Sequence, residues 1–211
     1  MSYCQTSFVE RDKATINTLI TKNPFATLLS NHQGNLEISH LPFIYDENEG
    51  ENGCLYAHFA RANRHWKAMD AASECVIVFQ GPHSYISPHW YEKKAEDHIP
   101  TWNYAVVHAH GSPQRIADKE KLFWQMNRIY ESHEKNSTLL VTEEEKSQLF
   151  AHVVLFRIAV TRFESIFKLS QNRSEGDAQG AIEGLANSLD TQKIELSQMM
   201  QVALSSRTQK A

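Results

Sequence analysis

The sequence predicts a mainly β fold, a closed or split β-barrel of antiparallel strands with helical additions. Six or seven strand-like segments are present, most of them joined by turns, and helical segments stand at the ends with one in a crossover. A doubly wound α/β fold is disfavoured. Its strands would alternate regularly with helices, and no GxGxxG follows a strand here.

Length and composition are those of an ordinary globular protein. The chain has 211 residues, 41% hydrophobic and 22% charged, enough for one large domain or a domain with a helical appendage. Its longest apolar run, residues 152–160, is interrupted by Arg157 and is shorter than the roughly 18–20 residues that span a bilayer. The N-terminus lacks the apolar stretch of a secretory signal, and the three cysteines are widely spaced. We therefore expect a cytoplasmic protein with free thiols and no membrane association.

The charge balance argues against a nucleic-acid surface. The formal net charge is −4, whereas a protein whose main partner is DNA usually has a basic face. The most basic stretch, residues 61–67, is too short to cover a duplex. It could still bind a single phosphate.

The first third of the chain predicts one helix followed by three strands. The helix is expected from about residue 11 to 22, because Asn23-Pro24 stops it. Strands are expected at 25–31, 35–46 and 54–60, with a turn at "NHQG" and an acidic loop at 46–53. Strands in such close succession are expected to form an antiparallel meander.

The remaining segments alternate between long strands and capped helices. Asp118 is expected to cap a helix over 119–132, and Thr142 to begin a capping box with Glu145. The other expected elements are a short helix at 62–73, a buried strand from 74 that runs into an extended segment broken by Pro82 and Pro88, a strand ending near Ala109, a long strand pair or one bent strand at 152–171, and helices from Gly176 onward.

The stretch "AHFARANRHW" suits a phosphate. His58, Arg61 and Asn63 lie where a strand ends and a helix begins. A helix N-terminus offers free N–H groups and positive potential, and a neighbouring arginine adds charged hydrogen bonds. The alternative is structural, with Arg61 exposed and Asn63 serving as a helix cap.

Two aromatic segments, "YISPHWY" at 85–91 and "IPTWNY" at 99–104, could form the wall of a planar ligand. Their rings would stack, while Ser87, Thr101 and Asn103 would supply hydrogen bonds. The alternative is aromatic core packing beneath a proline-rich loop. Two interpretations also apply to Lys168 and Gln171 in "FKLSQNRS". They could contact a ligand, or they could be polar residues where the chain leaves its last strand.

Metal and hydrolase chemistry are disfavoured. His108 and His110 share one strand face, but a metal site needs three or four ligands, and no HExxH or cysteine cluster supplies them. No GxSxG motif is present, and no cysteine lies in a recognisable catalytic context.

Taken together, "AHFARANRHW", "YISPHWY", "IPTWNYAVVHAHG" and "KLSQNRS" resemble, in order and spacing, the PaiB-like proteins, a family of FMN-binding negative transcriptional regulators. The resemblance covers about residues 1–205. It implies an antiparallel split barrel of the FMN-binding superfamily that also contains pyridoxamine phosphate oxidases and haem-degrading relatives. It also implies FMN as cofactor and a homodimer with flavin at the subunit interface. The barrel would cover residues 1–175, and 176–211 would be a helical extension of the same domain.

The resemblance also implies the residues that contact the flavin. Relatives often have Ser and Lys where this chain has Arg61 and Asn63, which leaves the phosphate geometry open. Thr101, Trp102 and Asn103 would line the pocket, from the same or from the second subunit, with Lys168 and Gln171 nearby. Strand residues Ile38, Ser39, His40 and Leu41 would run beside the isoalloxazine ring and the ribityl chain. Arg61 and Asn63 would bind the phosphate, and His58 would lie on the ribityl side.

Two functions fit this scaffold. The first is a flavin-binding transcriptional regulator that acts through its redox state or a protein partner, because the chain is acidic and lacks a helix-turn-helix pattern. The second is an FMN-dependent oxidoreductase acting on a small molecule. Haem binding through a histidine is a third, weaker possibility. The sequence names no catalytic residue, and a fold alone does not choose among these functions.

Overall fold

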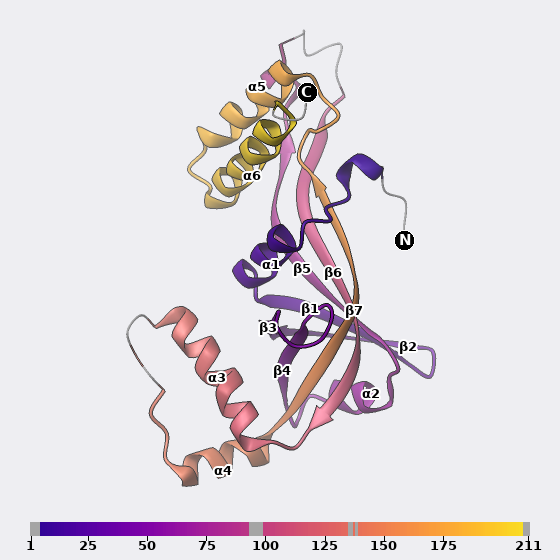
Figure 1. The fold of residues 1–211 in the computed structure, drawn as a ribbon, viewed down its shortest axis with the longest axis vertical. Helices are drawn as coiled ribbons and strands as arrows, with labels where there is room; N and C mark the ends of the chain where they lie inside the picture. The colour runs from indigo at the N-terminus through magenta and orange to yellow at the C-terminus, as the bar shows by residue number, and fades with distance from the viewer. Residues whose placement is uncertain (1–4, 93–98, 135–136, 138, 209–211) are drawn as a thin grey trace. The chain divides into compact units, whose positions relative to one another are not determined.

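The structure is a computed structural model that describes residues 5–92, 99–134, 137 and 139–208. It contains seven strands and six α-helices in the described residues (Figure 1). The strands are β1 (Phe25–His32), β2 (Asn35–Pro42), β3 (Ile44–Asp46), β4 (Cys54–Ala60), β5 (Cys75–Ile86), β6 (Thr101–Ile116) and β7 (Val153–Lys168). The helices are α1 (Lys13–Lys22), α2 (His65–Ala71), α3 (Lys119–His133), α4 (Glu143–His152), α5 (Glu175–Ala186) and α6 (Thr191–Thr208), with 3-10 turns η1 (Thr6–Phe8) and η2 (Pro88–Trp90).

The chain divides into two compact units that are interleaved in sequence. The barrel unit comprises residues 17–79 and 108–164. The helical unit comprises residues 1–16, 80–107 and 165–211. Strands β5, β6 and β7 each contribute one part to each unit, and the two units are described separately below.

The strands of the barrel unit follow an order that the sequence did not predict. The order in the sheet is β2-β1-β5-β6-β7-β4-β3, and the pairs β1–β2, β1–β5, β3–β4 and β4–β7 are antiparallel. The predicted meander is correct in its two antiparallel pairings, because 25–32 pairs with 35–42 and 44–46 pairs with 54–56. It is wrong in continuity, because β2 and β3 are separate strands at opposite ends of the order and β4 also pairs with β7. The expected strand 35–46 is broken at Phe43, whose N–H donates to the Pro24 carbonyl at 2.8 Å. The chain thus passes in one residue from one end of the strand order to the other.

The β1–β2 hairpin separates a buried face from an exposed one. Ala26, Leu28, Ser39 and Leu41 are buried, which places them on the core side. Their neighbours in sequence face outward, as the two-residue period of a strand requires. Directly opposite residues share a face, and on the outer face Phe25, Leu36, Ile38 and His40 are exposed while Thr27 and Leu29 are half-buried.

The helical unit is built on the hairpin of α5 and α6 (Figure 1). Gly180 and Gly184 lie one turn apart on α5, and both are in close contact with Trp90 of η2. A Cβ at Gly184 would meet the indole ring at 2.3 Å, so no other residue fits there without movement. Trp90 in the "YISPHWY" segment therefore serves core packing, the structural alternative of the sequence analysis.

Several local predictions are confirmed. The Asp118 side chain accepts from the Lys121 N–H at 3.0 Å, and Thr142 and Glu145 form the reciprocal capping box. Residues 153–168 are one strand, which decides between the two expectations for that segment. Strand β5 continues through Pro82, where the sequence predicted a break. The described part of the chain has no helix long and apolar enough to cross a membrane.

Candidate functional site

A buried hydrogen-bond network connects β1, β2 and the start of α2 in the barrel unit. His65 lies at its centre, with Nδ1 at 2.8 Å from the Ser39 Oγ and Nε2 at 2.9 Å from the Ser30 Oγ. Asn63 donates from Nδ2 to the same Ser39 oxygen at 3.1 Å and accepts the His65 N–H on Oδ1 at 3.1 Å. Two residues that the sequence assigned to different parts of the flavin, Ser39 and Asn63, are therefore bonded to each other.

The protonation of His65 follows from its surroundings. Burial lowers its pKa, and the Glu37 carboxylate only partly opposes that effect. In the neutral ring one nitrogen donates and the other accepts. A serine hydroxyl has one donor and two acceptor sites, so both neutral tautomers of His65 satisfy the contacts to Ser30 and Ser39, even with Ser39 accepting from Asn63. The sequence analysis did not identify His65 or Ser30.

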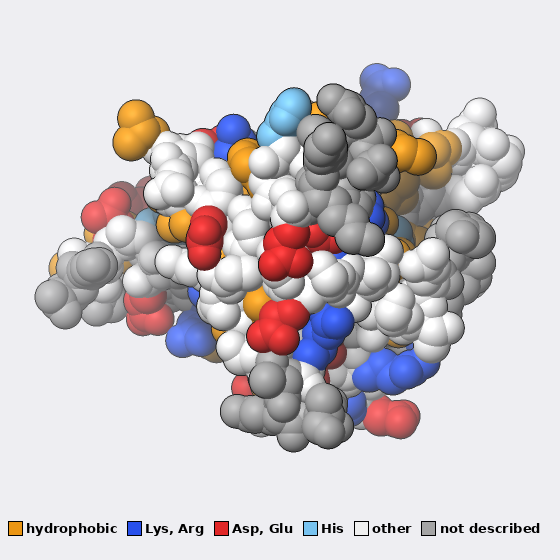
Figure 2. Space-filling model, turned by 90° about the horizontal axis from the view of Figure 1, so that it is seen from above, with side chains coloured by type: hydrophobic (Ala, Val, Ile, Leu, Met, Phe, Trp, Pro, Cys, Tyr) orange, Lys and Arg blue, Asp and Glu red, His pale blue; other side chains and the backbone are white. Residues whose placement is uncertain are grey.

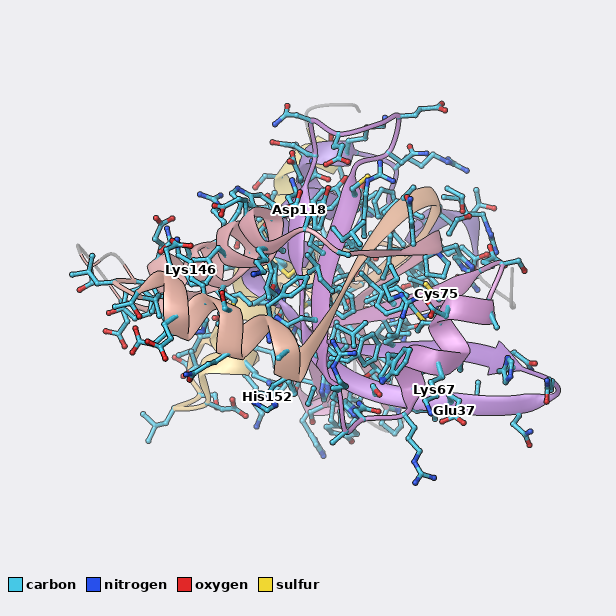
Figure 3. The ribbon with its side chains drawn as sticks, turned by 90° about the horizontal axis from the view of Figure 1, so that it is seen from below. Glu37, Lys67, Cys75, Asp118, Lys146 and His152 are labelled. Carbon is cyan, nitrogen blue, oxygen red and sulfur yellow. The ribbon has the colours of Figure 1, made fainter. Side chains whose placement is uncertain are left out.

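Arg61 connects the strand β4 exit to the end of α4. Its Nε donates to the Ala151 carbonyl at 2.7 Å and its Nη2 to the Val153 carbonyl at 3.1 Å. The Arg61 N–H donates to the carbonyl of His152, the residue labelled at the end of α4 in Figure 3. Carbonyls at a helix C-terminus have no partner within the helix, so Arg61 has a structural role. Two of its five N–H groups are used in this way.

A second arginine, Arg115, lies beside Arg61 at one cavity of the barrel unit. The cavity has a volume of about 330 Å³, and Phe150, Val154 and Leu155 are among its apolar lining residues. Arg115 forms an ion pair with Asp70 at 3.2 Å.

The surroundings of this cavity are basic and aromatic. The Arg115 guanidinium lies 5.6 Å from the centre of the Trp66 ring, and the Lys67 ammonium lies 5.7 Å from it. The Trp66 Nε1–H donates to the Arg61 carbonyl at 3.0 Å. Helix α2, which carries Lys67, contacts β2, and Figure 3 shows Lys67 and Glu37 close together in projection.

The predicted segment 38–41 divides between the two faces of β2. Ser39 and Leu41 are buried, whereas Ile38 is 52% exposed and His40 is exposed. The His40 ring stacks on Phe25, with ring centres 6.3 Å apart. Only Ile38 and His40 therefore have side chains on the outer face, where a planar ligand could contact them.

His58 is separate from the network around His65. Its Nδ1 lies 2.7 Å from Oε1 of Gln125, a fully buried residue of α3. The Gln125 Nε2 has no hydrogen-bond partner among the described residues. The pair links β4 to α3.

In the helical unit, three predicted residues meet at the end of β7. The Lys168 ammonium donates to the Thr101 hydroxyl and, at 2.7 Å, to the Trp102 carbonyl. Burial and the nearby Arg173 charge lower the Lys168 pKa. The Trp102 ring is 48% exposed and stacks on His83, with ring centres 5.8 Å apart.

Asn103 is the fully buried polar residue of the same unit. Its Nδ2 donates to the Ser170 hydroxyl at 2.8 Å and to the Met200 sulfur at 3.4 Å. Its Oδ1 has no hydrogen-bond partner among the described residues. Gln171 has a local role, because its side chain accepts the Leu169 N–H and donates to the Phe167 carbonyl. That turn holds Ser170 at a φ of 67°.

His108 and His110 of β6 are both half-buried. His110 lies between Glu74 and Glu164, with closest N–O distances of 3.7 Å to each, and Arg162 adds a positive charge. Burial and the charges of Arg162 and His108 lower the His110 pKa. No group of three or more possible metal ligands occurs within the described ranges.

The residues present fit the chemistry of FMN at two of its ends. Arg61 and Arg115 line one cavity and have guanidinium N–H groups suited to a phosphate. The outer face of β2 has exposed apolar and ring side chains suited to a flat heteroaromatic system. The structure therefore supports FMN binding by its donor set, and Arg115 is a phosphate candidate that no sequence motif marked.

Comparison with known proteins agrees with this fit. Residues 2–162 match the family model described as "Putative FMN-binding domain". The chain is 30% identical over 187 residues to the Protease synthase and sporulation protein PAI 2 of Bacillus subtilis, covering 86% of this chain and 88% of that protein.

Two solved structures share the fold. The flavocytochrome Anf3 of Azotobacter vinelandii is 12% identical with a TM-score of 0.57, covering 79% of this chain and 72% of that one. The FAD and haem binding protein of Mycobacterium smegmatis is 13% identical with a TM-score of 0.57, covering 81% and 78%. These likenesses confirm the predicted split barrel, and the family identifies FMN as the cofactor. The chain belongs to the PaiB-like family of FMN-binding split-barrel proteins.

Proposed function

We propose that this protein binds FMN with its phosphate at the cavity lined by Arg61 and Arg115. The two carbonyls that Arg61 contacts fix its guanidinium in place. Trp66 and Asp70 do the same for Arg115. Two immobilised guanidinium groups lose little side-chain entropy when a phosphate binds, so this pair carries the proposal.

The isoalloxazine ring is proposed to lie on the outer face of β2, against Ile38 and His40. Ser39 would act indirectly, because its buried hydroxyl ties β2 to His65 and Asn63. Asn63 would then position the turn after β4 instead of contacting phosphate itself. Bound FMN would supply redox chemistry, and the chain's own residues would bind and orient it.

A second copy of the chain is the proposed cover of this outer face. Phe25, Leu36 and Ile38 are 68%, 60% and 52% exposed on adjacent strands. An apolar strip of this kind is costly in water and typical of an interface between subunits. In such a dimer, Thr101, Trp102 and Lys168 are proposed to complete the flavin pocket of the other subunit.

The proposed role is regulation of transcription through flavin state or a protein partner. The support is the 30% identity, over most of the chain, to a protein named for protease synthesis and sporulation. The acidic chain suits an indirect effect, and Figure 2 shows Lys and Arg side chains mixed with Asp and Glu on the face it presents. Direct reading of DNA would favour one basic face.

A flavin oxidoreductase is the second candidate. The observation that favours it is Lys168, a partly buried cation with a lowered pKa beside Thr101 and Trp102. A cation of this kind can tune the electronics of a bound flavin ring. Oxidation of NADPH with bleaching of the flavin bands, followed by turnover with an added acceptor, would support this candidate.

The first experiment is titration of the purified protein with FMN, followed by its absorption and by gel filtration. Replacing Arg61 or Arg115 with Ala should weaken binding by about 1.5–3 kcal/mol, the cost of a lost charged hydrogen bond. Arg128→Ala is the matched control, because Arg128 lies outside that cavity. Equal affinity in all four proteins would remove the phosphate assignment.

Three further measurements test the proposed interface and the proposed regulatory role. Ile38→Glu should shift the sedimentation coefficient from dimer to monomer, and an unchanged coefficient would remove the proposed interface. Binding to promoter DNA should be weak and without sequence preference at moderate salt. Deletion of the gene should change transcript levels, and the Arg61→Ala/Arg115→Ala chain should fail to restore them. Restoration by that variant would contradict a flavin-dependent role.

A further inference from the structure

A second cavity of the barrel unit lies apart from every residue assigned to FMN. Its volume is about 260 Å³, and it is bordered by the end of α1, strand β3 and the end of α3. Ile20, Phe43 and Ile44 provide apolar surface, and Ile20 and Phe43 belong to the buried core. This is slightly below the roughly 300–1,000 Å³ of typical ligand sites, which limits an occupant to a small molecule.

The polar lining of this cavity is basic. Lys22, Arg128 and His133 line it together with the hydroxyl groups of Thr21 and Ser132, and no Asp or Glu is among the described lining residues. The carboxylate nearest to Arg128 in the ion pairs of the described chain is Glu131, at 3.8 Å, and both side chains are exposed. Such a pair is weak, so Arg128 keeps most of its capacity to bind an anion.

Helix ends account for part of this charge and leave the rest unexplained. Lys22 and His133 lie in the last turns of α1 and α3, where a cation complements the helix dipole. His133 already bonds through Nδ1 to the Ile129 carbonyl at 2.9 Å. Arg128, however, lies more than a turn before the end of α3, and the dipole gives no reason for a cation beside an apolar cavity there.

We propose that this cavity binds a small organic carboxylate with an apolar ring or short chain. The carboxylate would pair with Arg128 and Lys22, and the apolar part would cover Phe43 and Ile44. An inorganic anion would leave the apolar surface in water, and a neutral molecule would leave the guanidinium unpaired. Only a ligand with both features satisfies the whole lining.

The test is calorimetric titration of the full chain with benzoate and, separately, with benzyl alcohol. The two probes share a ring and differ in charge. Benzoate should bind with a dissociation constant of about 1 mM or lower. Benzyl alcohol should bind at least about tenfold more weakly, because it cannot form the charged hydrogen bonds. Equal affinities, or no benzoate binding up to about 10 mM, would overturn the proposal.

Variants locate the binding. Lys22→Gln/Arg128→Gln should weaken benzoate binding at least about tenfold, and Lys119→Gln/Lys146→Gln, outside the cavity, is the matched control for the loss of two positive charges. Ser132→Phe, which fills the cavity, should abolish binding without removing any charge. Far-ultraviolet circular dichroism and FMN affinity should stay unchanged in all three, which shows that each folds. Wild-type benzoate affinity in both the double variant and the filled variant would overturn the site.

Discussion

Two clusters of buried polar side chains, one around His65 and one around Asn103, differ in how completely their donors and acceptors are hydrogen-bonded. In the barrel unit, both ring nitrogens of His65 and both ends of the Asn63 amide have partners. In the helical unit, the Asn103 nitrogen has two partners, while its oxygen has none among the described residues. A buried acceptor without a partner costs about 1–3 kcal/mol, so the two groups contribute differently to stability.

This difference indicates two kinds of site. A fully bonded network fixes its elements and leaves little for a ligand to gain, which suits the supporting role of Ser39 and Asn63. A partly bonded residue can gain a partner from a ligand or a water molecule. Asn103 is therefore a position at which binding and stability can be separated by experiment.

The largest expected effect comes from removing the centre of the bonded network. His65→Phe should lower the free energy of unfolding by about 3 kcal/mol, because the Ser30 and Ser39 hydroxyls each lose a buried partner. Urea denaturation measures the change. His40→Phe is the matched control, since that exposed histidine should change stability by less than about 0.5 kcal/mol. Similar losses in both variants would contradict the structural role of the network.

A smaller loss is expected at the partly bonded residue. Asn103→Leu removes the hydrogen bond to Ser170 but also removes the unpaired buried oxygen. The free energy of unfolding should therefore fall by only about 1 kcal/mol. FMN affinity, measured on the same samples, decides whether Asn103 also serves the ligand. A loss as large as that of His65→Phe would show that Asn103 is as fully engaged as the barrel network.

The smallest effect concerns pH. Burial lowers the pKa of His65 below the ordinary value of 6.5, so between these two values the unfolded chain binds more protons than the folded one. The stability that neutral His65 contributes should therefore be complete above about pH 6.5. The free energy of unfolding should fall as the pH drops from about 6.5 through the lowered pKa.

Variants test this dependence. His65→Asn should reduce the slope without removing it, because the His110 pKa is lowered as well. Denaturation at several pH values between 7 and 5 measures the slope. An unchanged slope in His65→Asn would mean that other titratable groups cause the pH dependence.

Features of the fold that depend on residues close together in sequence were predicted, and features that depend on distant residues were not. The caps at Asp118 and Thr142 involve residues three apart, and both were predicted correctly. Strand partners are chosen by contacts far apart in sequence, so the pairing of β4 with β7 was missed. The break at Phe43 was missed for the same reason, because the Pro24 carbonyl that accepts its N–H lies between α1 and β1, far away in sequence.

The candidate site shows the same limit. The motifs marked Ser39, Arg61 and Asn63, yet the sequence did not separate contact from support. Strand alternation could have placed Ser39 and Leu41 on the face opposite Ile38 and His40. Nothing local could have marked Arg115, which reaches the cavity from a strand more than fifty residues after Arg61.

The single-residue step at Phe43 also bears on how the protein avoids aggregation. An open sheet ends in two edge strands whose free N–H and C=O groups can recruit another chain. Here the strands at the two ends of the order are consecutive in sequence, and the backbone N–H at the step is already used by Pro24. A foreign strand therefore meets a bend at this point instead of a straight template that continues from β2 into β3.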